Sequence, residues 1–164
     1  MNRIVRETVF RLNRVVGVCV FALALILVGS NSFAATDENV PVYTESGVAI
    51  RGTDPVAYFT QAKPVQGSAE FAAEFQGATW HFSSDENRDT FLTNPEKYAP
   101  AYGGYCAYAL SLGTHKVETD PKAWSIVDGR LYLNKTTVVR SIWETDIPGN
   151  IVKSEGNWAM LLSE

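Results

Sequence analysis

The segment between residues 80 and 113 constrains the fold most, because it places several strong folding signals next to one another. Apolar residues from Ala78 to Phe82 alternate with polar ones, which is the period of a half-buried strand. Ser83 predicts a helix N-cap, and Glu86 three residues later completes a capping box. We therefore predict a strand followed at once by a helix over residues 85–93.

The second half of this segment contains a paired glycine and a cysteine. Asn94–Pro95 predicts the end of one helix and the start of another turn, because proline suits the first helical position. If a short helix then begins near Tyr105, Cys106 lies in its first turn, where the helix dipole favours the thiolate that binds metals. If the same residues form a strand, Cys106 is a small buried hydrophobic residue instead. Gly113 is a plausible helix C-cap.

The residues before this segment predict short elements. The stretch 41–50 is typical of an edge strand interrupted at Gly47. Asp54 is placed to cap a helical turn over residues 56–60, with proline at its first position. Alternation over 68–75 favours a strand that pairs with residues 79–83.

The residues after it predict a hairpin and two helices. Residues 124–127 and 130–133 flank Asp128–Gly129, a dipeptide typical of two-residue hairpin turns. Asn134 is expected to cap a helix over 136–144, and Ile147–Pro148–Gly149 is expected to end it. A final helix is predicted from residue 150 to residue 162.

The N-terminus has the pattern of a secretory signal peptide. Four arginines and one glutamate occur in residues 1–14, and an apolar run follows over residues 15–28, too short to span a bilayer comfortably. Ser32–Phe33–Ala34 then offers the small residues that a signal peptidase reads. We expect cleavage before Ala35 and a periplasmic or secreted protein with no membrane association after signal removal.

The charge and cysteine content of the exported part narrow its function. Residues 35–164 carry ten Lys and Arg against seventeen Asp and Glu, a net charge of −7. Nucleic acids and anionic lipids reward basic patches, so neither is an expected partner. Cys106 is the only cysteine left after signal removal, so no intramolecular disulfide can form.

Several residues also resemble a known family. These residues are Asp54–Pro55–Val56, Trp80–His81–Phe82–Ser83–Ser84, Asn87, Phe91 and Asn94–Pro95–Glu96–Lys97–Tyr98. They resemble the YHS domain, a small module associated with heavy-metal and copper handling. The stretch from about Gly52 to Trp158 is similar to secreted bacterial single-domain YHS proteins that contain a Gly-Gly-Tyr-Cys-Ala segment. Metal-associated YHS modules carry cysteines where this chain has Ala57 and Ser83, so that ligand pair is absent here.

With this resemblance, the predicted elements indicate a single α+β domain, a small antiparallel sheet with helices packed on it. We expect three regions, namely a signal peptide over residues 1–34, a leader and edge segment over 35–51, and a YHS-like domain over 52–162.

The first functional hypothesis is a soft-metal site. Cu(I) prefers soft ligands at low coordination number, and a thiolate with an imidazole suits it. Cys106 is the candidate ligand, His81 its preferred partner and His115 the other histidine of the chain. A buried structural cysteine is the alternative for Cys106, and an exposed strand residue is the alternative for His81.

The second hypothesis is a metal-free binding or interaction module. Aromatic residues around the paired glycines are candidates to line a pocket for a small ligand or partner. The candidate ligand-binding residues are Tyr102, Gly103, Gly104, Tyr105 and Tyr108. The alternative is that most of these rings belong to the core. No motif specifies a reaction, so catalysis ranks last, and the oligomeric state is left open.

Overall fold

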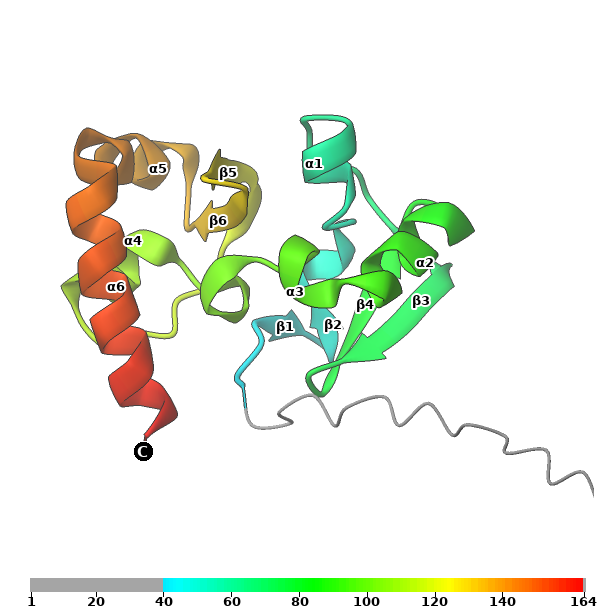
Figure 1. The fold of residues 1–164 in the computed structure, drawn as a ribbon, viewed down its shortest axis with the longest axis horizontal. Coiled ribbons are helices and arrows are strands. Elements are labelled where there is room, and N and C mark those ends of the chain that lie inside the picture. Colours follow the sequence, from blue (N-terminus) through cyan, green and yellow to red (C-terminus); the bar gives the residue numbers. More distant parts are fainter. Residues whose placement is uncertain (1–39, 164) are drawn as a thin grey trace, which may run out of the picture. The chain divides into compact units, whose positions relative to one another are not determined.

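The computed structural model describes residues 40–163, so the predicted signal peptide and its cleavage site lie outside the described residues. The described residues belong to one compact unit that combines helices with two small sheets, which confirms the α+β class (Figure 1). Within residues 40–163, no helix has the length and apolar character needed to cross a membrane.

The larger sheet has four strands in the order β1-β2-β4-β3. Its strands are β1 (Thr44–Glu45), β2 (Val48–Ala49), β3 (Ser68–Phe75) and β4 (Ala78–Phe82). Strands β3 and β4 form the predicted antiparallel hairpin, whereas β2 pairs with β4 in parallel. The sheet is therefore mixed rather than wholly antiparallel.

The smaller sheet pairs β5 (Asp120–Val127) with β6 (Arg130–Asn134) around the predicted Asp128–Gly129 turn. Both turn residues have positive φ, as a two-residue hairpin of this kind requires. The sequence pattern therefore located this hairpin correctly.

The helices follow the strands closely in the chain. They are α1 (Ala57–Thr60), α2 (Asp85–Thr93), α3 (Pro95–Tyr98), α4 (Ala107–Leu112), α5 (Thr137–Trp143) and α6 (Ile147–Leu162). Short 3-10 turns occur at η1 (Ile50–Gly52), η2 (Ala101–Gly104) and η3 (Glu144–Asp146). Helix α4 lies alongside α6, because two side chains of α6 donate to carbonyl groups of α4 (Figure 1).

The stretch 41–50 is interrupted at Gly47, as predicted, and it forms two short strands because Ser46 and Gly47 adopt positive φ and turn the chain back on itself. Two helix-cap predictions were wrong in detail. The cap of α2 is Ser84, and the cap of α5 is Thr136. The two residues that were predicted as caps make tertiary contacts instead, because Ser83 donates to Asp54 and Asn134 accepts from Tyr108.

The predicted break at residues 147–149 was also wrong. Asp146 accepts a hydrogen bond from the Gly149 N–H, and Pro148 lies in the first turn of α6. Proline is tolerated there because the first N–H groups of a helix have no intrahelical partner. The final helix therefore starts three residues earlier than predicted.

Two hydrophobic clusters form the interior. The first cluster packs the four-stranded sheet against α1, α2, α3 and β6, and its largest fully buried side chains are Trp80, Tyr58, Phe82, Phe91, Ile50, Leu131 and Leu133. The second cluster joins η2, α4, α5 and α6 with one residue of β6, and consists of Ala101, Tyr102, Ala107, Leu110, Tyr132, Trp143 and Leu161. The segment 98–104 passes from the first cluster to the second.

Candidate functional site

The turn η2 has an unusual backbone that follows from its glycines. Tyr102, Gly103 and Gly104 all have positive φ, at 58°, 60° and 84°. Tyrosine in this region costs about 1 kcal/mol or more, so the surrounding packing must hold it there. A side chain at Gly103 would collide with the carbonyl oxygen of Pro41, and one at Gly104 would lie 2.6 Å from Ile50 Cγ2. The paired glycines therefore admit the close approach of the N-terminal segment.

A hollow of about 370 Å³ lies beside this turn. Its walls come from the segment around the β3–β4 turn, α3 and the residues after it, η2, the start of β6, and α6. The lining residues are Val40, Phe75, Gln76, Glu96, Ala99, Pro100, Tyr102, Gly103, Arg130 and Trp158. Its volume is at the lower end of the roughly 300–1,000 Å³ typical of small-molecule sites. The size and the mixed lining suit a small organic ligand.

The aromatic side chains of the hollow are fixed by one another. The Tyr102 ring lies 5.9 Å from the ring of Tyr132 and 6.0 Å from that of Trp158. The guanidinium of Arg130 lies over the Tyr102 ring, 5.6 Å from its centroid.

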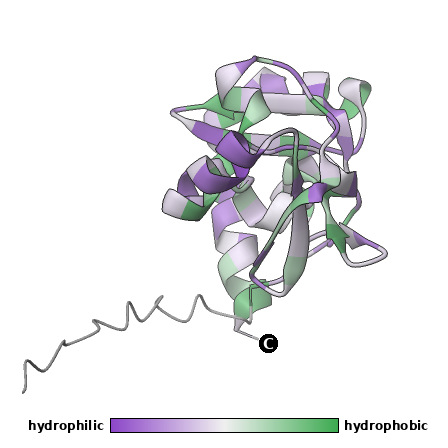
Figure 2. Cartoon of the chain, turned by 90° about the vertical axis from the view of Figure 1, so that its right-hand side faces the viewer, coloured by the Kyte–Doolittle hydropathy of each residue, from purple (hydrophilic) through white to green (hydrophobic). Residues whose placement is uncertain are grey.

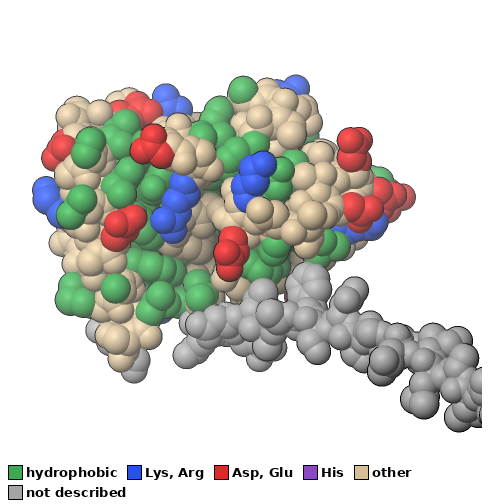
Figure 3. Space-filling model, in the orientation of Figure 1, with side chains coloured by type: hydrophobic (Ala, Val, Ile, Leu, Met, Phe, Trp, Pro, Cys, Tyr) green, Lys and Arg blue, Asp and Glu red, His purple; other side chains and the backbone are tan. Residues whose placement is uncertain are grey.

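On the face shown in Figure 3, basic and acidic side chains are interspersed among hydrophobic ones.

The phenol of Tyr102 is neutral at physiological pH. Burial raises its pKa above the ordinary value, the nearby Tyr132 adds to this rise, and the charge of Arg130 opposes it. The hydroxyl oxygen is buried and has no hydrogen-bond partner among the described residues. It is therefore a donor that the fold leaves unused.

Cys106 is enclosed. It occupies the N-cap position of α4, as the helical alternative predicted, but it is only 1% exposed. Its Sγ accepts a hydrogen bond from the Lys135 N–H at 3.3 Å and lies 3.7 Å from Asn134 Oδ1. These two contacts tie the start of α4 to the end of β6. They are the contacts expected of a buried structural cysteine, which was the alternative to a metal ligand.

The two histidines lie at other places. His115 is exposed and lies over Gly113, beyond the C-terminal end of α4. Cys106 caps the other end of this six-residue helix, which is about 9 Å long at 1.5 Å per residue. His81 is half-buried on β4, where it pairs with Ala72. Within residues 40–163, no group of three His, Cys, Asp or Glu side chains is placed to hold one metal ion.

A buried carboxylate organises the first cluster. Asp54 Oδ1 accepts from the backbone N–H groups of Val56 and Ala57, as its predicted cap role requires. Asp54 Oδ2 accepts from Ser83 N at 2.8 Å, Ser83 Oγ at 2.6 Å and Asn87 Nδ2 at 2.7 Å. This network binds α1, the end of β4 and α2 into one unit.

A comparison with family models places residues 56–102 in the YHS domain family. The chain contains a YHS domain. No curated protein and no solved structure gives a significant match. The matched range ends at Tyr102, so Cys106, α4, the β5–β6 hairpin, α5 and α6 lie beyond it.

The YHS domain here has hydrogen bonds where thiols are expected in metal-associated relatives. Ala57 and Ser83 stand where the resemblance described above implies cysteines, and the Ala57 backbone N–H and the Ser83 hydroxyl both donate to the carboxylate of Asp54. The fold thus brings the two positions together, but it gives them a hydroxyl and a methyl group in place of sulfur.

The predicted ligand-binding residues separate into two groups. Tyr102 and Gly103 line the hollow at the end of the YHS domain. Gly104 packs on Ile50, Tyr105 donates from its hydroxyl to the Val42 carbonyl, and the Tyr108 N–H donates to Asn134. Those three do not line this hollow.

Sequence reasoning missed most of the hollow. Arg130 follows directly on the Asp128–Gly129 turn, and Trp158 lies in the final helix α6. Phe75 ends β3, and Gln76 belongs to the β3–β4 turn. No sequence motif joins these residues, because they meet only when the second cluster packs against the YHS domain.

Proposed function

We propose that this chain is an exported YHS-domain protein that binds a small organic ligand in the hollow beside Tyr102. The observation that carries the proposal is the hollow itself, in which the rings of Tyr102 and Trp158 meet the Arg130 guanidinium at the edge of the YHS domain. Aromatic walls with a few polar groups are the usual composition of small-molecule sites. No resident metal is required for binding of this kind.

This proposal takes precedence over copper binding because of the surroundings of Cys106. Copper handling is associated with the YHS family, but the one thiol among the described residues, that of Cys106, is buried and already engaged in hydrogen bonds. A soft-metal site would need that sulfur to leave its contacts and a second ligand to approach it.

The binding proposal is tested with a neutral aromatic probe. We expect 2-naphthamide to shift the indole N–H signal of Trp158 in ¹H–¹⁵N spectra, because Trp158 is the one tryptophan that lines the hollow. The Trp158→Phe variant should bind the probe more weakly, whereas the control Trp124→Phe, which removes a ring packed on Tyr58, should leave binding unchanged. Equal binding by wild type and Trp158→Phe would contradict the proposed site.

Export is tested separately. The basic start, the apolar run and the Ser32–Phe33–Ala34 site support a periplasmic or secreted location. When the full chain is expressed in a Gram-negative host, we expect the periplasmic fraction to contain a protein whose N-terminal residue is Ala35, as read by mass spectrometry. An uncleaved protein in the membrane fraction would refute this assignment.

A further inference from the structure

Arg130 is the one cation that lines the hollow, and its guanidinium is weakly engaged. Its closest carboxylate among the described residues is that of Glu155, with a nitrogen-to-oxygen distance of 3.8 Å that exceeds a hydrogen bond. Its other close partners are the face of the Tyr102 ring and the hydroxyl of Tyr132, and its side chain is 49% exposed. The guanidinium is thus oriented by a ring while its N–H groups remain available to a ligand.

The charges of the lining restrict the ligand further. Glu96, the one carboxylate that lines the hollow, is exposed in the first turn of α3. An anionic group beside Glu96 would be repelled, whereas one beside Arg130 would be attracted and could accept two parallel N–H bonds. The half-buried ring of Trp158 supplies most of the aromatic surface that a ligand can reach, because Phe75 and Tyr102 also line the hollow but are only 5% and 2% exposed.

We infer that the ligand is an organic monoanion with a flat apolar body, whose carboxylate or comparable group binds Arg130. This inference rests on the proposed function, since it names the class of ligand that the hollow takes. The apolar body lies against the ring of Trp158, and the single negative charge lies at the β6 side of the hollow, where Arg130 covers the buried Tyr102 ring.

The experiment compares two probes of nearly the same shape. 2-Naphthoate carries one negative charge, and 2-naphthamide is its neutral counterpart. With the purified wild-type protein, we expect 2-naphthoate to bind about tenfold more tightly than 2-naphthamide, as a half-exposed charge-assisted pair of about 1.4 kcal/mol would give. The ratio should fall as the salt concentration rises.

Two variants decide whether Arg130 is responsible. In Arg130→Met the ratio should fall to about one while the affinity for 2-naphthamide stays close to that of the wild type. The control Lys153→Met removes an exposed cation of α6 that does not line the hollow, so it makes the same change in net charge and should keep the ratio.

The possible outcomes separate the two proposals. Equal affinities of the wild type for the two probes, or a ratio that survives Arg130→Met, would overturn the anion inference while the binding function stands. If neither probe binds to the wild type, the proposed function itself fails.

Discussion

The two hydrophobic clusters of this protein treat their polar groups differently. In the first cluster, the buried carboxylate of Asp54 accepts five hydrogen bonds, and the buried indole of Trp80 donates to the Phe75 carbonyl. In the second cluster, three buried polar atoms have no hydrogen-bond partner among the described residues, namely Tyr102 Oη, Asn134 Nδ2 and Trp143 Nε1. The buried polar groups of the first cluster are therefore paired within the fold, whereas the second cluster contains buried donors without such a partner among the described residues.

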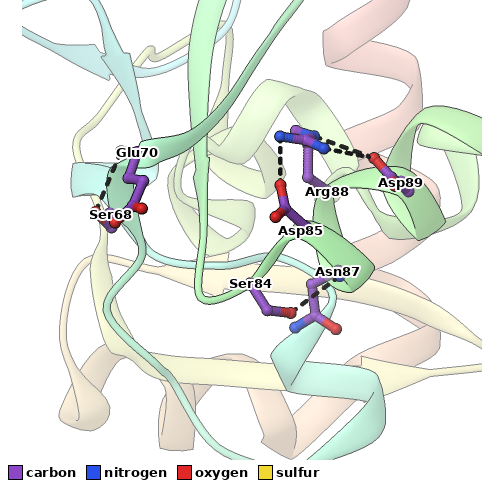
Figure 4. A network of polar contacts seen from close by, with 7 residues as sticks. All are labelled: Ser68, Glu70, Ser84, Asp85, Asn87, Arg88 and Asp89. Atoms are coloured by element: carbon purple, nitrogen blue, oxygen red, sulfur yellow. Dashed lines mark hydrogen bonds and ion pairs between the residues drawn. The ribbon is translucent and has the colours of Figure 1, made fainter.

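The surfaces over the two clusters differ in the same way. Arg88 of α2, over the first cluster, bridges Asp85 and Asp89, so this helix presents an ion-paired face to solvent (Figure 4). Over the second cluster, Val152 and Met160 of α6 are exposed, and the last turn of this helix is hydrophobic (Figure 2). The two clusters therefore differ both in how their buried polar groups are paired and in the side chains that their helices present to solvent.

The largest effect is expected at the buried carboxylate. Asp54→Ala leaves five donors without an acceptor, and we expect the free energy of unfolding to fall by about 4 kcal/mol or more. Ser83→Ala, which removes one of these bonds, should cost about 1 kcal/mol. Urea denaturation followed by circular dichroism measures both values.

The matched control for this series is Asp85→Asn. Asp85 is a largely exposed carboxylate of α2 that pairs with Arg88, so its loss should cost less than about 0.5 kcal/mol. If Asp54→Ala costs no more than Asp85→Asn, the first cluster does not depend on its hydrogen-bond network.

A second pair of variants compares the two clusters directly. Trp80 and Trp143 are both fully buried, and replacement by phenylalanine removes the same atoms from each. Trp80→Phe also orphans the Phe75 carbonyl, whereas the Trp143 indole N–H has no partner to lose among the described residues. We expect Trp80→Phe to lower the free energy of unfolding by about 1 kcal/mol more than Trp143→Phe. Equal costs would remove the distinction between the clusters.

Alkaline pH provides a third test. Burial raises the pKa of Tyr58 and Tyr102 above the ordinary value of about 10, so the folded protein holds phenolic protons that the unfolded chain releases. This contribution to stability is fully present below about pH 10 and should be lost as the pH rises above it. We expect the urea midpoint to fall between pH 9 and pH 11, and to fall less steeply in the double variant Tyr58→Phe, Tyr102→Phe. An unchanged slope in that variant would contradict the assignment.

The smallest effect is expected in copper binding. Because the sulfur of Cys106 is enclosed, wild type and Cys106→Ala should bind Cu(I) equally weakly in competition with a chelator. Tighter binding by the wild type, lost in Cys106→Ala, would restore the soft-metal hypothesis and transfer the function from the hollow to the start of α4.

Sequence reasoning predicted the local elements because their signals are local. The alternation in β4, the Asp128–Gly129 turn and the Asn94–Pro95 junction each act over a few residues, and each was confirmed. Side chains with a choice of partners were harder to predict. Ser83 and Asn134 suit a helix cap by type, but in the fold each finds a distant partner and the next suitable residue takes its place.

The sequence by itself determined the strand and helix pattern, the YHS resemblance and the single cysteine of residues 35–164, since these depend on residue type and short spacing. Only the tertiary structure decided that Cys106 is enclosed and that Phe75, Arg130 and Trp158 surround Tyr102. The physical reason is that burial and convergence depend on how elements far apart in the chain pack together. No pattern within a short window contains that information.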